Sequence, residues 1–202
     1  MLTCFKARKQ KIKMLKISSK NLKKANFEEI DLREKSFEKE KLEKKVKFLA
    51  KSLVKKLREK KLKITTMESC LGGALINEIT NIPHASEITD GALITYSVAQ
   101  KIKRGVPKKI IEKFGVYSKE TALSMALAVK KEIKSEIAIG VTGVLSRKDP
   151  KAPSKKIGEV YIGFVLKNNL FSKKLLLPVL KERALEKKVV VLKILEVLNK
   201  VL

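Results

Sequence analysis

Hydrophobic side chains recur every three or four positions between Leu42 and Leu57, and Lys and Glu fill most of the positions between them. At 3.6 residues per turn this spacing puts the apolar side chains on one face of a helix. The pattern predicts an amphipathic helix from about residue 37 to about residue 60, with Phe48 off the apolar stripe. Residues 1–36 show no sustained apolar period, so we expect a basic, flexible tail there and a folded domain over residues 37–202.

Beyond this helix, short apolar runs alternate with helical segments. The runs at 62–67, 92–96 and 137–141 are predicted strands, and those at 160–166 and 170–177 read as a hairpin turning at Asn168 and Asn169. Helices are predicted from Gly73 to before Pro83, over 97–103, over 107–115, after Ser118 and over 181–201. Strands that alternate with helices favour a mostly parallel sheet covered on both faces. The fold class predicted is therefore α/β, a three-layer α/β/α sandwich with a terminal antiparallel hairpin.

Composition narrows the possible partners. A net charge of +26 suits nucleic-acid binding, but only 6 of the 47 basic residues are Arg, and the lysines are spread along the chain as on a solvated surface. We therefore expect a small-molecule substrate and no nucleic-acid partner. The two cysteines form no metal-binding spacing, which fits the reducing cytoplasm, and no apolar run approaches the roughly 20 residues of a membrane span.

Three residues with hydroxyl groups fall at or just past the ends of predicted strands: Ser69, Tyr96 and Thr142. In sheets of this kind the active site lies beyond the carboxyl ends of the strands, so we expect these residues to share one site. Ser69 precedes a predicted helix, and Gly72 and Gly73 would let a substrate approach the backbone closely. The hydroxyl of Ser69 could be a nucleophile, or it could simply cap the helix.

A serine nucleophile needs a base. The only histidine, His84, lies in a loop after Pro83, and a lysine can serve instead if burial lowers its pKa. Lys101 follows the strand that ends at Tyr96, and its side chain could reach back to the carboxyl end of that strand. With 41 lysines in the chain, the position of Lys101 alone does not select it as the base. Tyr96 could relay a proton, form a hydrogen bond with the nucleophile, or be a strand aromatic that packs an edge of the sheet.

Two further residues near the predicted site leave alternatives open. Thr142 could hold the reacting amide, help align Lys101, or bond its own backbone as turn residues do. Cys70, beside Ser69, could be a rival nucleophile or a small buried residue.

A series of short motifs adds a more specific indication. The motifs are ESCLGG at 68–73, GALITYSVAQK at 91–101, GVP at 105–107, GVYS at 115–118 and VTG at 141–143. With these motifs, the chain from about residue 46 to the end resembles the CinA carboxy-terminal domain family, the nicotinamide-nucleotide amidohydrolases, also called nicotinamide mononucleotide deamidases. The resemblance implies an α/β/α fold and hydrolysis of nicotinamide mononucleotide to nicotinate mononucleotide and ammonia in pyridine-nucleotide recycling, with no metal and no cofactor.

The same resemblance assigns roles to individual positions. It makes Ser69 the nucleophile and Lys101 the base, with Tyr96 and Thr142 assisting them. It also places a further set of residues at the substrate, with the last near the substrate phosphate, and we expect a homo-oligomer. The set is Glu68, Cys70, Gly72, Gly73, Gly143 and Arg183.

The chain departs from the family pattern in three places. Leu71 stands where the family has Thr, Met67 replaces an Ala, and residues 144–147 replace an I-A-G-P sequence that begins a Gly-rich loop. These departures keep a second hypothesis open, a diverged non-catalytic domain whose basic surface binds nucleic acid or a protein partner.

Overall fold

A six-stranded mixed sheet forms the centre of the protein in a computed structural model that describes residues 26–147, 149–150 and 154–202. The strand order is β1-β6-β5-β4-β2-β3. Strands β2, β3 and β4 run parallel, the β4–β5 and β5–β6 pairs are antiparallel, and β1 joins β6 in parallel. The strands are β1 (Asn26–Asp31), β2 (Ile64–Glu68), β3 (Leu93–Ile94), β4 (Ile137–Gly143), β5 (Glu159–Leu166) and β6 (Asn169–Leu176).

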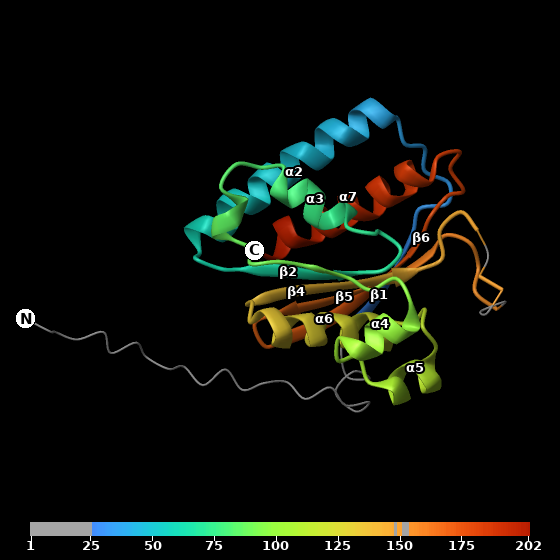
Figure 1. Cartoon of the computed structure of the whole chain (residues 1–202). Coiled ribbons are helices and arrows are strands. Elements are labelled where there is room, and N and C mark those ends of the chain that lie inside the picture. Colours follow the sequence, from blue (N-terminus) through green and yellow to red (C-terminus); the bar gives the residue numbers. More distant parts are fainter. Residues whose placement is uncertain (1–25, 148, 151–153) are drawn as a thin grey trace, which may run out of the picture.

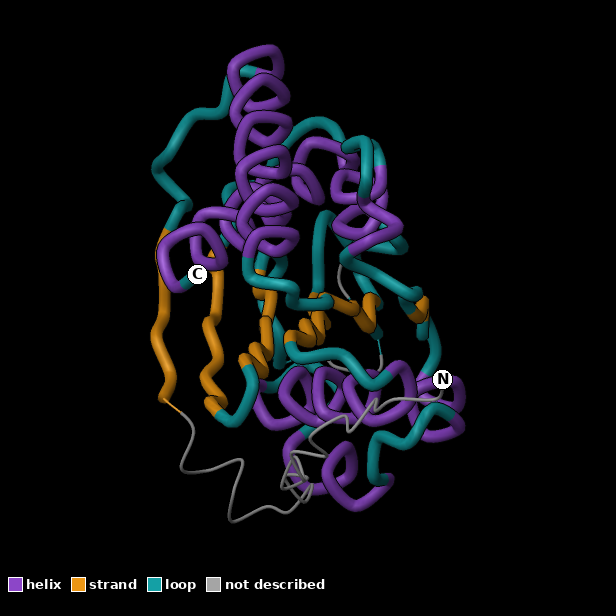
Figure 2. The backbone as a smooth tube through the Cα atoms, turned by 90° about the vertical axis from the view of Figure 1, so that its left-hand side faces the viewer, coloured by secondary structure: helices purple, strands orange, loops and turns teal. Residues whose placement is uncertain are grey.

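Helices cover both faces of this sheet, so the molecule has three layers (Figures 1 and 2). One face carries α2 (Lys39–Glu59), α3 (Ala74–Thr80) and α7 (Arg183–Val201), and the other carries α4 (Val98–Lys103), α5 (Lys108–Phe114) and α6 (Lys119–Ile133). A short 3₁₀ helix, η1 (Ala85–Glu87), leads toward β3. The predicted α/β/α sandwich with its terminal hairpin is confirmed. None of the helices within the described ranges is long and apolar enough to cross a membrane.

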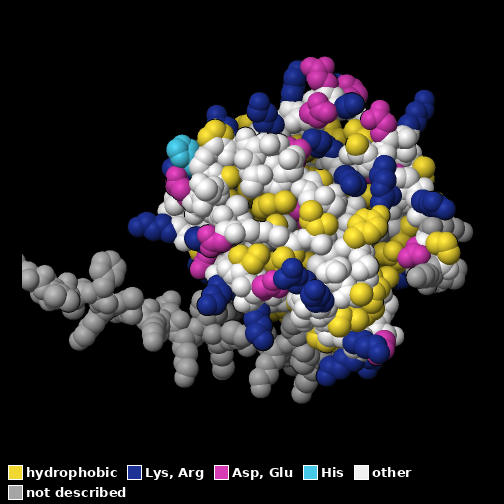
Figure 3. Space-filling model, viewed as in Figure 1, with side chains coloured by type: hydrophobic (Ala, Val, Ile, Leu, Met, Phe, Trp, Pro, Cys, Tyr) yellow, Lys and Arg dark blue, Asp and Glu magenta, His cyan; other side chains and the backbone are white. Residues whose placement is uncertain are grey.

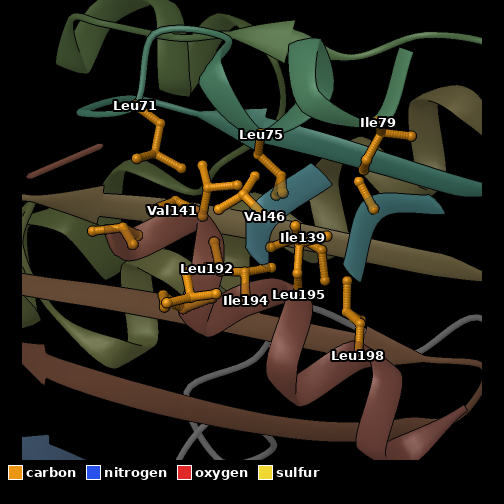
Figure 4. Packing of buried hydrophobic residues seen from close by; sticks show 14 of the residues in the cluster. Val46, Leu71, Leu75, Ile79, Ile139, Val141, Leu192, Ile194, Leu195 and Leu198 are labelled. Carbon is orange, nitrogen blue, oxygen red and sulfur yellow. The ribbon is translucent and has the colours of Figure 1, made fainter. Parts of the chain in front are cut away.

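The larger core lies between the sheet and the layer of α2, α3 and α7. Leu75 and Ile79 from α3 meet Val46 from α2 and Leu195 from α7 over the sheet (Figure 4). All four side chains are fully buried. The apolar stripe predicted for α2 is the face that packs here, and Phe48, predicted to lie off it, is 71% exposed.

On the opposite face, α6 packs unusually close to the sheet. Gly140 of β4 and Gly163 of β5 are directly paired, and both lie under the backbone of α6 at Ala122. A Cβ atom on Gly140 would lie 2.1 Å from the Ala122 carbonyl oxygen, far inside contact distance. The two glycines therefore allow the helix backbone to rest directly on the strands, because no side chain separates them.

The structure corrects the predicted amino-terminal boundary. Residues 26–31 form edge strand β1, and Leu32 is fully buried and donates its amide to the carbonyl of Leu176 at 2.8 Å. The expectation of a flexible tail is therefore wrong for residues 26–32, while residues 1–25 lie outside the described part of the chain. Other boundaries shift slightly: the strand predicted over 92–96 is only Leu93–Ile94, and β4 extends to Gly143.

Candidate active site

Ser69 lies at the point where the chain changes direction across the sheet. From β2 the chain crosses one face through α3 to reach β3, then crosses the other face through α4, α5 and α6 to reach β4 on the opposite side of β2. The turn after β2 stays tied to both neighbours, because the Ser69 amide donates to Val141 at 3.0 Å and the Thr95 amide donates to Glu68 at 2.8 Å. Such a switch point leaves a crevice beyond the strand ends, where α/β proteins bind ligands.

The amine of Lys101 reaches the Ser69 hydroxyl at this switch point. Nζ lies 2.9 Å from the Oγ of Ser69, and it also donates to the main-chain carbonyls of Thr95 at 2.7 Å and Tyr96 at 3.3 Å. Lys101 is 1% exposed and Ser69 is 6% exposed. Burial lowers the pKa of Lys101 to about 8, because desolvation disfavours the charged ammonium. Within the described residues no carboxylate forms an ion pair with Lys101 to oppose this effect.

Helix α4 aims the lysine. Ser97 caps this helix, and its Oγ accepts a hydrogen bond from the amide of Gln100 at 3.2 Å. The cap fixes where the helix starts, so Lys101 stands on its first turn with its side chain folded back over Thr95 and Tyr96 toward β2.

Glu68 is predicted at the substrate, but the structure turns its side chain toward the start of α3. Its fully buried carboxylate accepts the amides of Gly73 at 2.9 Å, Leu75 at 3.2 Å and Ile76 at 3.0 Å, and the hydroxyl of Thr66 at 3.0 Å. The carboxylate therefore satisfies the free amides at the start of α3 and fixes the turn that carries Ser69. Glu68 is thus a positioning residue for this turn.

Cys70 lies in the hydrophobic core, and its predicted contact with a substrate stays a prediction. Its side chain is 4% exposed and belongs to the core beneath α3 and α7. Burial raises the pKa of its thiol to about 12, so the thiolate needed for nucleophilic attack does not form near neutral pH. The structure thus supports the small buried residue among the two alternatives for Cys70.

Tyr96 and Thr142 border the site but do not make the predicted contacts. The side chain of Tyr96 is 70% exposed, and only its main-chain carbonyl contacts Lys101. Thr142 is fully buried, and its hydroxyl donates to the carbonyl of Val116 at 3.1 Å, so it holds the segment before Tyr117 and does not align Lys101. The alternative prediction, that the Thr142 hydroxyl bonds the neighbouring backbone of its own turn, is also wrong, because its partner Val116 is 26 residues away in the sequence.

The three glycines predicted at the substrate have different roles. A Cβ on Gly143 would lie 2.6 Å from the carbonyl oxygen of Glu159, so this glycine is required by strand packing. Gly73 uses its amide for Glu68 and has a φ of +98°. Gly72, with a φ of +62°, opens the turn toward α7, where the Nζ of Lys187 would lie 3.4 Å from an added Cβ.

Lys187 was not identified from the sequence. It lies one helical turn after Arg183 on α7, so the two cations occupy the same side of the helix near the Ser69 turn. The charge of Arg183 also acts on the thiol of Cys70. The side chain of Arg183 is exposed, and its contact to a substrate phosphate stays a prediction.

A second missed pair joins the loop after β4 to the site. The hydroxyl of Tyr117 donates to the carboxylate of Asp149 at 2.6 Å. Burial, followed by this carboxylate, raises the pKa of Tyr117. The hydrogen bond therefore ties the loop after β4 to the segment between α5 and α6.

His84 is remote from Ser69. Its ring nitrogen lies 3.0 Å from a carboxylate oxygen of Glu87, which also pairs with Arg58 near the end of α2. The carbonyl of Ile88, four residues after His84, accepts the amide of Ile64 at the start of β2. Ser69 follows the opposite end of this strand. Lys101 is thus the base candidate that the structure brings to Ser69. Over the described ranges, no group of three or more His, Cys, Asp or Glu side chains is arranged to hold a metal ion.

Comparison with known proteins agrees with this architecture. A family model described as the CinA C-terminal domain matches residues 46–202. A protein of Caldicellulosiruptor bescii named as competence-damage inducible is 41% identical over 117 residues, 57% of this chain and 28% of that protein. A CinA-like protein of Kosmotoga olearia is 36% identical over 124 residues, 61% of this chain and 30% of that protein. The chain spans about three tenths of the length of these curated relatives.

Solved structures show the same fold. The competence/damage inducible protein CihA from Agrobacterium tumefaciens superposes with a TM-score of 0.71 at 26% identity, covering 76% of this chain and 93% of that one. A CinA superfamily protein from Escherichia coli gives a TM-score of 0.72 at 20% identity, over 78% of this chain and 90% of that one, which supports the fold alone.

Proposed function

Because the chain belongs to the CinA C-terminal domain family, we propose that it is an amidohydrolase that converts nicotinamide mononucleotide to nicotinate mononucleotide and ammonia. The observation that carries the proposal is the 2.9 Å contact between Lys101 Nζ and Ser69 Oγ, made by an amine that is buried and has only carbonyl oxygens as further partners. A neutral amine at this distance is within reach of the hydroxyl proton that a serine nucleophile must lose.

The proposed reaction proceeds in two halves. In the first, neutral Lys101 accepts the proton of Ser69 while Oγ attacks the amide carbon, and the resulting ammonium returns that proton to the departing nitrogen, which leaves as ammonia. In the second, Lys101 takes a proton from water as the water oxygen attacks the ester on Ser69. The carboxylate product leaves and Oγ regains its proton, so the enzyme returns to its starting state.

The negative charge that develops on the carbonyl oxygen needs a donor near Ser69. Within the described residues, the amides of Ser69, Gly72 and Gly73 already donate hydrogen bonds to other residues, whereas those of Cys70 and Leu71 do not. The amides of Cys70 and Leu71 are therefore the main-chain donors that we assign to this oxygen. A donor of this kind typically contributes a few kcal/mol to transition-state stabilisation.

The basic surface gives no specific support to the second hypothesis of nucleic-acid binding. On the face shown in Figure 3, Lys and Arg side chains lie scattered among acidic and apolar ones. Several of them are paired, as in Lys63 with Asp90 at 2.7 Å and Arg104 with Glu132 at 2.8 Å. Mixed charges of this kind are typical of a solvated surface.

Ammonia release from nicotinamide mononucleotide tests the proposal directly. We expect release by the unaltered protein and at least a thousandfold loss of kcat in Ser69→Ala and Lys101→Met, because each removes a reacting group. Circular dichroism of both variants should match that of the unaltered protein. The exposed Lys47→Met on α2 is the matched control and should retain activity. Full turnover by folded Ser69→Ala would exclude Ser69 as the nucleophile.

A further inference from the structure

We infer that a groove between the end of α7 and the outer strands of the sheet is a second ligand site, which takes a free carboxylic acid with a hydrocarbon body. The groove lies at the end of the sheet opposite to Ser69. Its lining includes the first residues of three strands that run parallel to β2, whereas Ser69 follows the last residue of β2. The inference therefore does not depend on the proposed function.

The groove has the size of a ligand site. It encloses about 890 Å³ and is open to solvent. Figure 2 shows this end of the molecule, where the end of α7, marked C, lies beside the outer strands. Sites for small molecules commonly have volumes of roughly 300–1,000 Å³. The groove is thus large enough for a small organic ligand.

The floor of the groove is apolar and only partly covered. Phe171, for example, stacks on the fully buried ring of Phe164 with 4.6 Å between centroids, yet stays partly exposed. Single apolar side chains on a surface are ordinary, whereas a contiguous set marks a binding site. Five half-buried side chains of the lining pack against the main core in this way: Leu62, Leu166, Phe171, Val197 and Leu202.

Unpaired lysines surround this floor. Lys60, Lys167 and Lys200 line the groove with exposed side chains, and in the described parts of the chain none of them forms an ion pair with an acidic side chain. The acidic residue of the lining, Glu28, is already paired with Lys173. Positive charge therefore remains in excess around an apolar floor, and an anion complements it.

The carbonyl groups at the end of α7 do not cancel this charge. A helix carries partial negative charge at its carboxyl end, which would disfavour an anion nearby. Here lysine side chains already meet two of these carbonyls, because Lys56 donates to Asn199 and Lys60 donates to Leu202. The amines of Lys167 and Lys200 donate no hydrogen bond within the described residues, so they stay available to a ligand.

The combination of floor and lysines selects an acid that has an apolar body. A carboxylate can accept hydrogen bonds from two ammonium groups at once. A hydrocarbon body would remove the partly exposed floor from water, and it suits a floor that is aliphatic apart from Phe171. A ligand with both parts is therefore bound more tightly than either part alone.

Calorimetric titration with decanoate, below the concentration at which it forms micelles, tests the inference. We expect one decanoate per chain. Acetate lacks the hydrocarbon body and decyltrimethylammonium reverses the charge, so each should bind at least about tenfold more weakly. Equal binding of decanoate and decyltrimethylammonium would overturn the site, and so would binding to vesicles of anionic phospholipid without binding of free decanoate.

Variants assign the binding to the groove. Lys167→Met and Lys200→Met should each weaken decanoate binding about two- to fivefold, the range of an exposed ion pair. Val201 lines the groove and is 49% exposed, so Val201→Asp should weaken binding at least about tenfold without disturbing the core. Lys47→Met and Phe48→Asp make the same changes on the exposed face of α2 and should keep full affinity. Full affinity in the three groove variants would overturn the site.

Hydrogen exchange and a catalytic variant separate this site from the active site. Decanoate should slow amide exchange in peptides covering residues 166–173 and 197–202, and leave the turn at Ser69 unchanged. Ser69→Ala should bind decanoate as the unaltered protein does, whether or not the protein releases ammonia. Protection confined to the Ser69 turn, or loss of decanoate binding in Ser69→Ala, would show that the acid occupies the active site and not the groove.

Discussion

The amine of Lys101 donates a hydrogen bond of 2.7 Å to the main-chain carbonyl of Thr95, which lies six residues earlier, before the start of α4. Together with the carbonyl of Tyr96, this contact holds the amine at Ser69 without supplying a full negative charge. A carboxylate at the same place would stabilise the ammonium and raise its pKa. Carbonyl dipoles instead leave burial as the dominant effect, so the amine can lose its proton near neutral pH.

The pH dependence of activity should follow this amine. With a pKa of about 8, roughly a tenth of Lys101 is neutral at pH 7. We expect kcat/KM for ammonia release to rise about tenfold per pH unit below pH 8 and to level off above it. Measurement between pH 6 and 9.5 checks this, with Lys101→Arg as an inactive comparison because Arg keeps its proton. An apparent pKa near the ordinary lysine value would contradict the assignment.

Stability should depend on pH through the same residue. Because the pKa of Lys101 is about 8 in the folded protein and 10.5 when unperturbed, the unfolded state binds more protons between these values, and stability rises with pH across that window. The destabilisation is fully present below pH 8 and amounts to about 3 kcal/mol. Lys101→Met removes it. We therefore expect the free energy of unfolding of Lys101→Met, minus that of the unaltered protein, to decrease between pH 7.5 and 10.5. A difference that stays constant over this range would contradict the lowered pKa of Lys101.

Glu68→Gln should reveal the positioning role of that carboxylate. Glutamine offers one acceptor oxygen where Glu68 uses two, and its amide group would face the amides of α3. We expect a loss of about 1–3 kcal/mol in urea unfolding and a lower kcat with little change in KM, because Ser69 is displaced while the substrate contacts remain.

Its matched control is Glu43→Gln on the exposed side of α2, which should change neither quantity. A Glu68→Gln variant with unchanged kcat and stability would show that the four hydrogen bonds at Glu68 do not hold the nucleophile.

Much of the fold could be predicted because an element with one buried and one solvated face has apolar residues at regular intervals. The apolar stripe that includes Val46 and Leu53 is such a pattern, and it predicted α2 within two residues at each end. Strand β1 shows no such pattern, because five of its six residues are exposed and it is held by pairing with a strand about 145 residues away. An ion pair such as Lys174 with Glu29, at 2.9 Å, cannot be foreseen from local pattern.

The site divides in the same way. The motifs identified Ser69 and Lys101, and the structure brings them together. The motifs could not predict the direction in which a side chain points. A Glu next to Ser69 in the sequence can face a substrate or, as Glu68 does, the amides of the next helix. Lys187 was hidden for a different reason, because one lysine among 41 becomes informative only when the fold brings it beside Gly72.

Gly140→Ala should strongly destabilise the domain. The new methyl group would lie 2.1 Å from the carbonyl oxygen of Ala122 and 2.6 Å from the amide of Ala126, so α6 must lift from the sheet. We expect a loss of at least the roughly 1–3 kcal/mol typical of overpacking, read from urea denaturation. Gly115→Ala is an informative comparison, because nothing lies within 4 Å of its added Cβ and only its φ of +82° opposes the change. Equal stability of both variants would refute close packing at Gly140.

Tyr117→Phe should loosen the loop that follows β4. It removes the 2.6 Å hydrogen bond to Asp149, and bonds to charged groups contribute about 1.5–3 kcal/mol. We expect faster amide hydrogen exchange in peptides covering residues 144–150 and a severalfold rise in KM, because the loop borders the crevice. Tyr96→Phe is the control for exchange, since within the described residues its hydroxyl makes no hydrogen bond. If loop exchange in Tyr117→Phe equals that in Tyr96→Phe, the contact does not restrain the loop.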